Sequence, residues 1–166
     1  PSGVVGAVLD AAGFNPAHTA RQHLRVYSAL GGHPDRRVDE VIDRLDITGF
    51  ADRPTGGYST GRRHRLHLAT ALLGDPRVLL LDEPANGLDP QGIAWLRGLL
   101  RDLADTGHTV LVSSHVLSEM EHTIDHVVMI SHGRLVASKT IGELTENSTL
   151  ENEFLRLTAH RQEASR

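Results

Sequence analysis

The spacing of apolar residues predicts helices in the first half of the chain. From Thr19 to Leu30 the apolar residues give one helical face, and from Asp35 to Leu45 they recur at i, i+3, i+4 and i+7, as on one face of an amphipathic helix. A loop region rich in Gly, Pro and Thr follows over 46–58. A third helix is expected to begin at Ser59 and to run to Leu73, where Gly74 and Pro76 stop it.

Beyond these helices the pattern alternates between strands and helices. The run Arg77–Leu81 is nearly all apolar, which is typical of a strand buried on both faces of a parallel sheet. The other expected elements are strands over Val4–Leu9, Thr109–Ser113, His126–Ile130 and Leu135–Ser138, and helices over Pro90–Ala104, Val116–Thr123, Ile141–Leu144 and Leu150–Thr158. We expect a hairpin turn at 131–134 and otherwise parallel pairing in an α/β fold.

Two adjacent carboxylates follow the apolar run directly. Asp82 and Glu83 stand at the carboxyl end of the predicted strand, where ligands of open α/β sheets bind. Carboxylates delivered by a buried strand carry a desolvation cost unless a cation or proton shares the site. We therefore expect Asp82 to hold Mg²⁺, directly or through water, and Glu83 to accept a proton from an attacking water. On the pair alone, a strand capped by two solvated acids explains the sequence equally well.

Other polar residues stand at predicted helix starts and strand ends. Ser59 and Gly61 open the third helix, where free backbone amides can bind an anion. Without other motifs, a helix cap followed by a solvated basic turn is the favoured alternative. Asp89 precedes a proline and can serve simply as a helix N-cap. His115 follows the predicted strand Thr109–Ser113, and a histidine at a strand end beside the carboxylates can contact a phosphate.

The chain contains no G-x-x-x-x-G-K-[ST] phosphate loop. Its one lysine, Lys139, comes after the carboxylates. The segment 133–140 imitates the motif, but Ser138 occupies the second glycine position and the segment contains its own apolar strand, so we reject it. The chemistry of the carboxylates is thus indicated without the phosphate cradle that normally accompanies it.

Composition narrows the function classes. The 166 residues include no cysteine, which excludes disulfides, thiolate metal sites and thiol catalysis. The net charge of −4 gives no basic footprint for nucleic acid. No apolar run approaches the roughly 20 residues that cross a bilayer. Among the other side chains, we expect His64 and His67 on an exposed helix face and Trp95 as a packing residue.

Taken together, the motifs resemble the nucleotide-binding domain of ABC transporters over essentially the whole chain. The matching segments are YSTGRRHRL at 58–66 for the signature, LLLDEP at 79–84 for the Walker B strand, GLDP at 87–90 for the D-loop and SSH at 113–115 for the switch histidine. Their order and spacing agree with the family. The first residues resemble the Q-loop, and TLENEFLRLT resembles the closing helix of bacterial export ATPases.

The resemblance implies a fold, a set of site residues and cofactors. The fold is an α/β partial P-loop NTPase domain with a parallel sheet core and an inserted helical subdomain. Its segments are 1–17 (Q-loop region), 18–75 (helical subdomain with the signature), 76–140 (core with Walker B, D-loop and switch His) and 141–166 (C-terminal helices). With ATP and Mg²⁺ as cofactors, the implied roles are catalysis by Glu83 and His115, Mg²⁺ binding by Asp82, and nucleotide contacts by Ser59, Gly61, Asp89 and Asp10.

The resemblance also implies partners. In the family, two such domains sandwich two ATPs head to tail and act through a membrane permease, so we expect a peripheral ATPase subunit at the cytoplasmic face of the membrane. Only 48 residues separate Asp10 from Ser59, a compact helical segment that suits docking against a membrane partner. We expect export through a separate permease and no nucleic-acid partner.

Three departures from the family pattern qualify these expectations. Asp10 stands where a glutamine is expected and cannot donate a hydrogen bond. Thr60 replaces the first signature glycine and adds a Cβ where backbone should approach phosphate. The missing phosphate loop is expected upstream of Pro1 with the first strands of the domain, which leaves an exposed sheet edge. The chain alone is then inactive; the alternative is a non-catalytic regulatory partner that lacks the loop.

Overall fold

The computed structural model describes residues 3–9 and 13–163, which form two compact units. The first unit ends at Ser113 and the second begins at Ser114. The first contains a three-stranded sheet and the second a two-stranded sheet, each with its own helices. The segment borders expected after residues 17, 75 and 140 separate motifs, whereas the division after Ser113 separates compact units. The expected borders therefore stay predictions.

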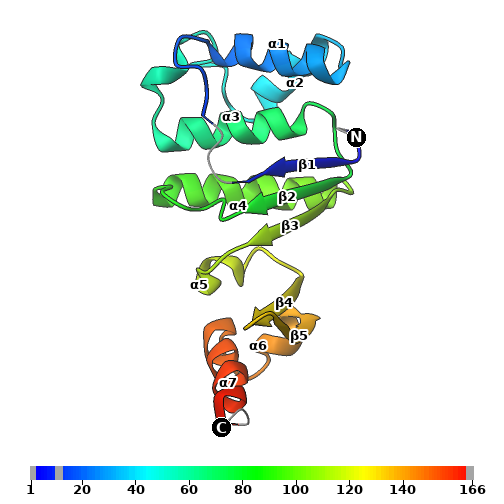
Figure 1. The fold of residues 1–166 in the computed structure, drawn as a ribbon, viewed down its shortest axis with the longest axis vertical. Helices are drawn as coiled ribbons and strands as arrows, with labels where there is room; N and C mark the ends of the chain where they lie inside the picture. The colour runs from blue at the N-terminus through cyan, green and yellow to red at the C-terminus, as the bar shows by residue number, and fades with distance from the viewer. Residues whose placement is uncertain (1–2, 10–12, 164–166) are drawn as a thin grey trace. The chain divides into compact units, whose positions relative to one another are not determined.

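The sheet of the first unit is parallel, with its strands in chain order (Figure 1). The strands are β1 (Val5–Val8), β2 (Val78–Asp82) and β3 (Thr109–Ser113). The central strand β2 buries Leu79 and Leu81, and its register places Asp82 beside Ser113. Parallel pairing is therefore confirmed for these three strands.

Among the residues that the structure describes, four helices complete the first unit. They are α1 (Ala20–Gly31), α2 (Arg36–Arg44), α3 (Thr60–Leu72) and α4 (Pro90–Asp105), with a 3₁₀ turn at Thr55–Gly57. The helix α3 packs against β1 and α4 against β3, while α1, α2 and α3 pack on one another. The largest fully buried side chains are Leu24, Val38, Val41, Ile42, Leu45, Ile47, Leu66, Leu68, Leu72, Leu79 and Leu103. The apolar helix stripes thus form the predicted core.

Side-chain caps explain where these helices begin. Thr19 and Gln22 form a capping box, in which Thr19 Oγ1 accepts from Gln22 N at 3.1 Å and Gln22 Oε1 accepts from Thr19 N at 2.9 Å. Ser59 caps α3 and Asp89 caps α4 without such a box, each by accepting one backbone amide through its side chain. Each cap satisfies a backbone amide that the helix itself leaves without a partner.

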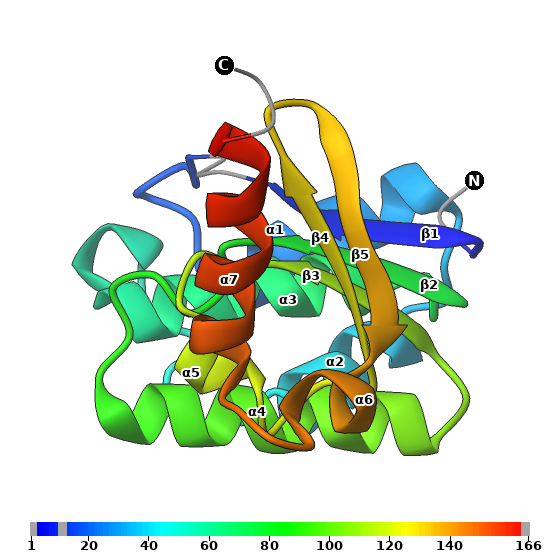
Figure 2. The same cartoon turned by 90° about the horizontal axis from the view of Figure 1, so that it is seen from below.

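The second unit is built around an antiparallel hairpin, shown clearly in Figure 2. Its elements are α5 (Leu117–Met120), β4 (His126–Ser131), β5 (Arg134–Thr140), α6 (Ile141–Thr145) and α7 (Leu150–Glu163). The two turn residues, His132 and Gly133, have φ of 49° and 71°, as a type I′ hairpin turn requires. The hairpin and helices bury Val127, Met129, Leu144 and Leu150.

Two expectations about this unit are wrong. Parallel pairing does not extend to β4, which among the described strands pairs with β5, antiparallel and through the expected hairpin turn. The helix expected over Val116–Thr123 ends at Met120, whose carbonyl accepts from the amides of both Thr123 and Ile124 as the chain turns. The expected hairpin turn is confirmed. The segment 133–140, rejected above as a phosphate loop, is mostly strand β5.

Within the described part of the chain, no helix has both the length and the apolar character that crossing a bilayer requires.

Candidate functional site

The two carboxylates lie where the sequence placed them, but on an unusual backbone. Asp82 ends β2 with an exposed side chain, and Glu83 follows, half-buried. Glu83 has φ of 46°, in the left-handed region, which for a non-glycine residue costs on the order of 1–3 kcal/mol. Its N–H donates to Ser113 O at 3.1 Å, and its carbonyl accepts from Asn86 N at 3.1 Å. Both bonds hold the strained peptide in place.

Ser113 contacts both carboxylate residues through its hydroxyl. The hydroxyl donates to Asp82 Oδ1, and the same Oγ accepts from Glu83 N at 3.1 Å. The sequence pattern pointed to the SSH segment only for its histidine and missed this serine. A hydroxyl residue ending the strand next to a carboxylate strand is the signal that could have found it.

The donor atoms at this edge fit Mg²⁺. Carboxylate and hydroxyl oxygens are hard ligands, which Mg²⁺ prefers, and Mg²⁺ usually takes one or two carboxylates together with waters and phosphate oxygens. In residues 3–9 and 13–163, no three His, Asp or Glu side chains gather as a metal site. The assignment of Mg²⁺ to Asp82 stays a prediction.

The signature turn, residues 59–61 at the start of α3, packs against the turn at residues 87–89, which precedes α4. Ser59 is the N-cap of α3, and its Oγ accepts from Arg62 N at a long 3.5 Å. A Cβ built on Gly87 would lie 3.2 Å from Thr60 Cγ2, and one on Gly61 would lie 3.8 Å from Leu88 Cδ2. The extra methyl of Thr60 is therefore directed at Gly87, which has φ of 73°.

A pocket of about 380 Å³ opens beside these two turns. Its lining residues are Asp46, Gly49, Phe50, Ser59, Gly61, Arg62, Arg65, Leu88, Asp89, Gln91, Gly92 and Trp95. The N-terminal ends of α3 and α4 both border it, and helix N-termini favour anions. The structure thus brings together three of the predicted nucleotide contacts, Ser59, Gly61 and Asp89.

Two arginines of α3 stack on aromatic rings in the wall of this pocket. The Arg65 guanidinium lies 4.1 Å from the centroid of the Trp95 ring, and its Nη1 donates to Asp46 Oδ2 at 2.7 Å. The Arg62 guanidinium lies 5.0 Å from the centroid of the Phe50 ring. Trp95 packs against the core, as predicted, and also fixes Arg65, which the sequence did not reveal.

The capping alternatives for Asp89 and Ser59 are confirmed. Asp89 Oδ1 accepts from Gly92 N at 2.7 Å, with Pro90 as the first helical residue of α4. Ser59 caps α3 through the bond to Arg62 N. Each cap occupies one backbone amide, and the other amides of the same turn can still contact a ligand. The nucleotide contacts of both residues therefore stay predictions.

The expectation for His64 and His67 is wrong, because both side chains are half-buried. His64 Nδ1 donates to Pro84 O at 3.0 Å, so it ties α3 to the turn after the carboxylates. The His67 ring lies 4.2 Å from the ring of Phe14. Burial, together with the charges of His64 and Arg63, lowers the pKa of His67. The histidines of α3 therefore belong to its packing surface.

The two remaining predicted site residues are Asp10 and His115. Asp10 lies outside the described residues. His115 belongs to the second unit, and its side chain is exposed. The catalytic role of His115 and the nucleotide contact of Asp10 both stay predictions.

Comparisons with known proteins converge on one family. A family model described as "ABC transporter" matches residues 1–86, which contain the signature turn and the carboxylate strand. The chain is similar to the bacitracin transport ATP-binding protein BcrA of Bacillus licheniformis, with 36% identity over 152 residues that cover 90% of this chain and 50% of that protein. It is also similar to the lantibiotic transport ATP-binding protein SrtF of Streptococcus pyogenes, with 30% identity over 81% of this chain and 59% of that protein.

A solved structure supports the fold. The chain resembles a structure titled as the ATP binding subunit of an ABC transporter, with a TM-score of 0.80 and 22% identity over 93% of this chain and 68% of that one. The α/β fold class with a parallel sheet is thus that of an ABC ATPase domain. The chain spans about half the length of the curated relatives it matches.

Proposed function

The chain belongs to the ABC transporter family, and we propose that it forms part of an ATPase subunit that drives export through a separate membrane permease. The observation that carries the proposal is the geometry at the tip of β2. There Asp82 and Glu83 stand side by side, held by Ser113, in the same unit as the signature turn. A structural cap of solvated acids has no need for a strained glutamate or for a hydroxyl shared between both residues.

Each carboxylate has its own task in the proposed reaction. Asp82 holds Mg²⁺, which when bound neutralises charge on the phosphates of ATP. Glu83 accepts the proton of the attacking water, a contribution of typically 10²- to 10⁴-fold in rate. Because the backbone of Glu83 is left-handed, its side chain leaves the chain in a different direction from the one that an extended strand would give it. His115 is proposed to contact the transferred phosphate.

The pocket lined by Ser59, Gly61 and Asp89, called the signature pocket, is proposed to contact a nucleotide bound to a second ATPase domain. Ser59 and Gly61 would grip phosphates held by a partner domain in a head-to-tail dimer. The two helix N-termini bordering the pocket support this assignment, because both attract negative charge. Relatives named for bacitracin and lantibiotic transport support a permease partner, and with it a peripheral position at the cytoplasmic face of the membrane.

The phosphate cradle is proposed to be encoded outside these 166 residues. The sequence contains no G-x-x-x-x-G-K-[ST], so it cannot hold the β- and γ-phosphates in the usual way. The same observation favours a second candidate function, a non-catalytic partner that offers only the signature pocket to another ATPase. In that case the carboxylates would serve no hydrolysis.

Hydrolysis assays separate the two candidates. The 166-residue chain and the natural gene product that contains it, called here the parent protein, are assayed for Mg²⁺-dependent ATP hydrolysis. We expect hydrolysis by the parent protein and a negligible rate for the chain alone. Robust hydrolysis by the chain alone would contradict the assignment of the phosphate cradle. A parent protein that neither binds nor hydrolyses ATP would favour the non-catalytic partner.

A further inference from the structure

We propose that Ser113 is a positioning residue that fixes both carboxylates of the ATPase site through one hydroxyl group. The inference rests on the proposed function and adds a residue to it. A parallel register places Asp82 and Ser113 as neighbours at the same edge of the sheet. Their side chains leave the strand ends together, which brings the hydroxyl within reach of the carboxylate.

A hydroxyl is suited to this position because it donates and accepts at once. It carries one O–H donor and two acceptor lone pairs. At Ser113 the donor is directed to Asp82 Oδ1, and a lone pair accepts the N–H of Glu83. Alanine offers neither group, whereas threonine offers both. The chemistry therefore calls for a hydroxyl and not merely for a small side chain.

The contact to Glu83 acts on its backbone. The N–H of Glu83 is shared between Ser113 O and Ser113 Oγ, each 3.1 Å away. A glutamate in the left-handed region relaxes toward more favourable dihedrals unless its surroundings hold it. Two acceptors from one residue hold the peptide between the carboxylates, and this peptide determines where the Glu83 side chain departs.

The contact to Asp82 acts on its side chain. Asp82 is exposed, and an exposed carboxylate samples several rotamers. Within the described part of the chain, the Ser113 hydroxyl is the only hydrogen-bond partner of its carboxylate, at Oδ1. This bond orients Oδ2 for a cation. Residues that orient metal ligands in this way typically change metal affinity or activity 10- to 100-fold when removed.

Three variants of the parent protein test the inference. Ser113→Ala removes the hydroxyl, and Ser113→Thr keeps it. Thr109→Val removes a hydroxyl from the opposite end of β3 and so controls for effects on the strand itself. The first readout is Mn²⁺ affinity in the presence of a non-hydrolysable ATP analogue, measured by electron paramagnetic resonance. The second is the rate of ATP hydrolysis at saturating Mg²⁺.

We expect Ser113→Ala to bind Mn²⁺ about tenfold more weakly and to hydrolyse ATP at least about tenfold more slowly. Ser113→Thr should restore both quantities, and Thr109→Val should leave both unchanged. A folded Ser113→Ala variant with wild-type Mn²⁺ affinity overturns the inference. So does a Ser113→Thr variant as defective as Ser113→Ala, since the hydroxyl would then be irrelevant.

Failure of the proposed function gives a different result. A wild-type parent protein that binds neither Mn²⁺ nor the ATP analogue contradicts the proposed function itself. The role of Ser113 is then decided by amide hydrogen exchange at Glu83, which needs no metal. Exchange should be faster in Ser113→Ala than in wild type or Ser113→Thr, and equal rates in all three overturn the inference.

Discussion

Among single residues, Glu83 combines an unfavourable backbone with the most demanding proposed role. Its left-handed φ of 46° is a local strain that neighbouring bonds from Ser113 and Asn86 maintain. The sequence predicted a carboxylate here because an apolar strand ends at Asp82. It could not predict the conformation, because two of the bonds that hold it come from Ser113, which lies 30 positions later along the chain.

His23 shows a second residue-scale effect, a histidine kept neutral by its surroundings. It is half-buried, with its ring 4.9 Å from Phe14 and 4.5 Å from Tyr27 and Nε2 3.1 Å from Thr70 Oγ1. Burial, followed by the nearby charges of His67 and His18, lowers the pKa of His23 to about 4 from its usual 6.5. The folded state therefore resists protonation that the unfolded state accepts.

The sign of the pH dependence follows from this shift. Between pH 6.5 and about 4 the unfolded chain binds the His23 proton and the folded chain does not. The stability that neutral His23 provides is thus fully present above pH 6.5 and is lost as the pH falls toward about 4. Urea unfolding at about pH 7.5 and about pH 5 should show a smaller loss of stability in His23→Leu than in wild type. An equal loss in both proteins would contradict the assignment.

At the scale of elements, the apolar period predicted most helices and strands because local signals agreed with it. Thr19, Ser59 and Asp89 each cap a helix at the position where the helical pattern begins. The turn at His132 and Gly133 predicted the antiparallel pairing of β4 with β5, whereas the alternation of strands and helices wrongly placed β4 in the parallel sheet. Turn chemistry therefore outweighs alternation when a strand's partner is inferred.

The close approach of β1 to α3 gives an element-scale prediction. A Cβ at the buried Gly6 would lie 2.5 Å from Ala71 O and 2.8 Å from Pro76 Cγ, so Gly6→Ala must push the elements apart. We expect a loss of about 1–3 kcal/mol in the free energy of unfolding, measured in urea. The control is Gly98→Ala on the exposed face of α4, which should gain about 0.5–1 kcal/mol. A Gly6→Ala variant as stable as wild type would disprove this packing.

At the scale of the whole molecule, the motifs predicted which candidate residues come together better than they predicted the contacts around them. The sequence placed Asp82 and Glu83 at one strand tip and Ser59, Gly61 and Asp89 in what the structure shows to be one pocket. It did not reveal the contacts that come from distant parts of the chain, which are the Ser113 hydroxyl, the Arg65–Trp95 stack and the His64–Pro84 bond. Such contacts depend on tertiary packing, which no local pattern encodes.

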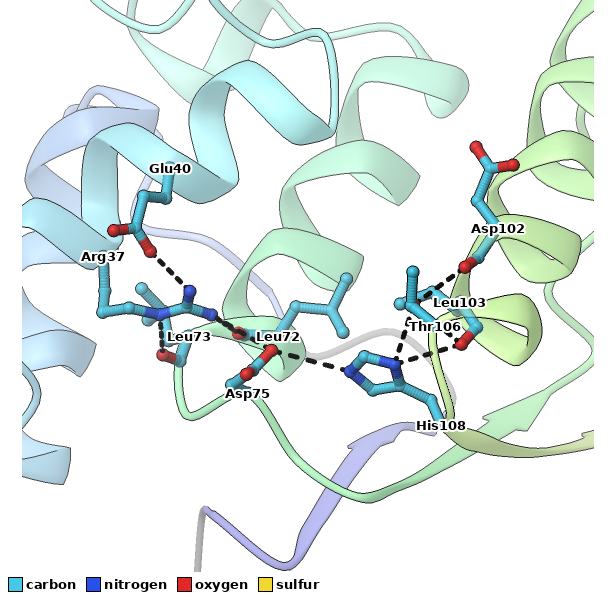
Figure 3. Close-up of polar contacts among 9 residues, drawn as sticks. All are labelled: Arg37, Glu40, Leu72, Leu73, Asp75, Asp102, Leu103, Thr106 and His108. Carbon is cyan, nitrogen blue, oxygen red and sulfur yellow. Dashed lines mark hydrogen bonds and ion pairs between the residues drawn. The ribbon is translucent and has the colours of Figure 1, made fainter.

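A polar network shows how distant parts of the first unit are joined (Figure 3). Arg37 of α2 donates to the carbonyls of Leu73 at 3.0 Å and Leu72 at 2.9 Å, which are carbonyls at the C-terminus of α3. Asp75 lies 3.6 Å from Arg37 Nη2 and 3.5 Å from His108 Nε2. The helix that carries the signature at its start is thus anchored at its end.

Loss of this anchor should be measurable. Arg37 is 21% exposed and bonds main-chain carbonyls, so Arg37→Ala should reduce the free energy of unfolding by about 2 kcal/mol. The neighbouring Arg36 is 78% exposed and lies 3.7 Å from Glu40, so Arg36→Ala should change it by less than about 0.5 kcal/mol. Urea denaturation of both variants tests this, and equal effects would show that the Arg37 contacts contribute nothing specific.

In the proposed reaction Glu83 activates water for ATP hydrolysis, and replacement of Glu83 with glutamine removes this ability. Glutamine keeps the shape of the side chain but cannot accept the proton. In the parent protein, Glu83→Gln should lower the hydrolysis rate by about 10²- to 10⁴-fold while ATP affinity stays at the wild-type value. Glu151→Gln, on the exposed first turn of α7, is the matched control and should hydrolyse ATP normally. Appreciable hydrolysis by Glu83→Gln would contradict the account.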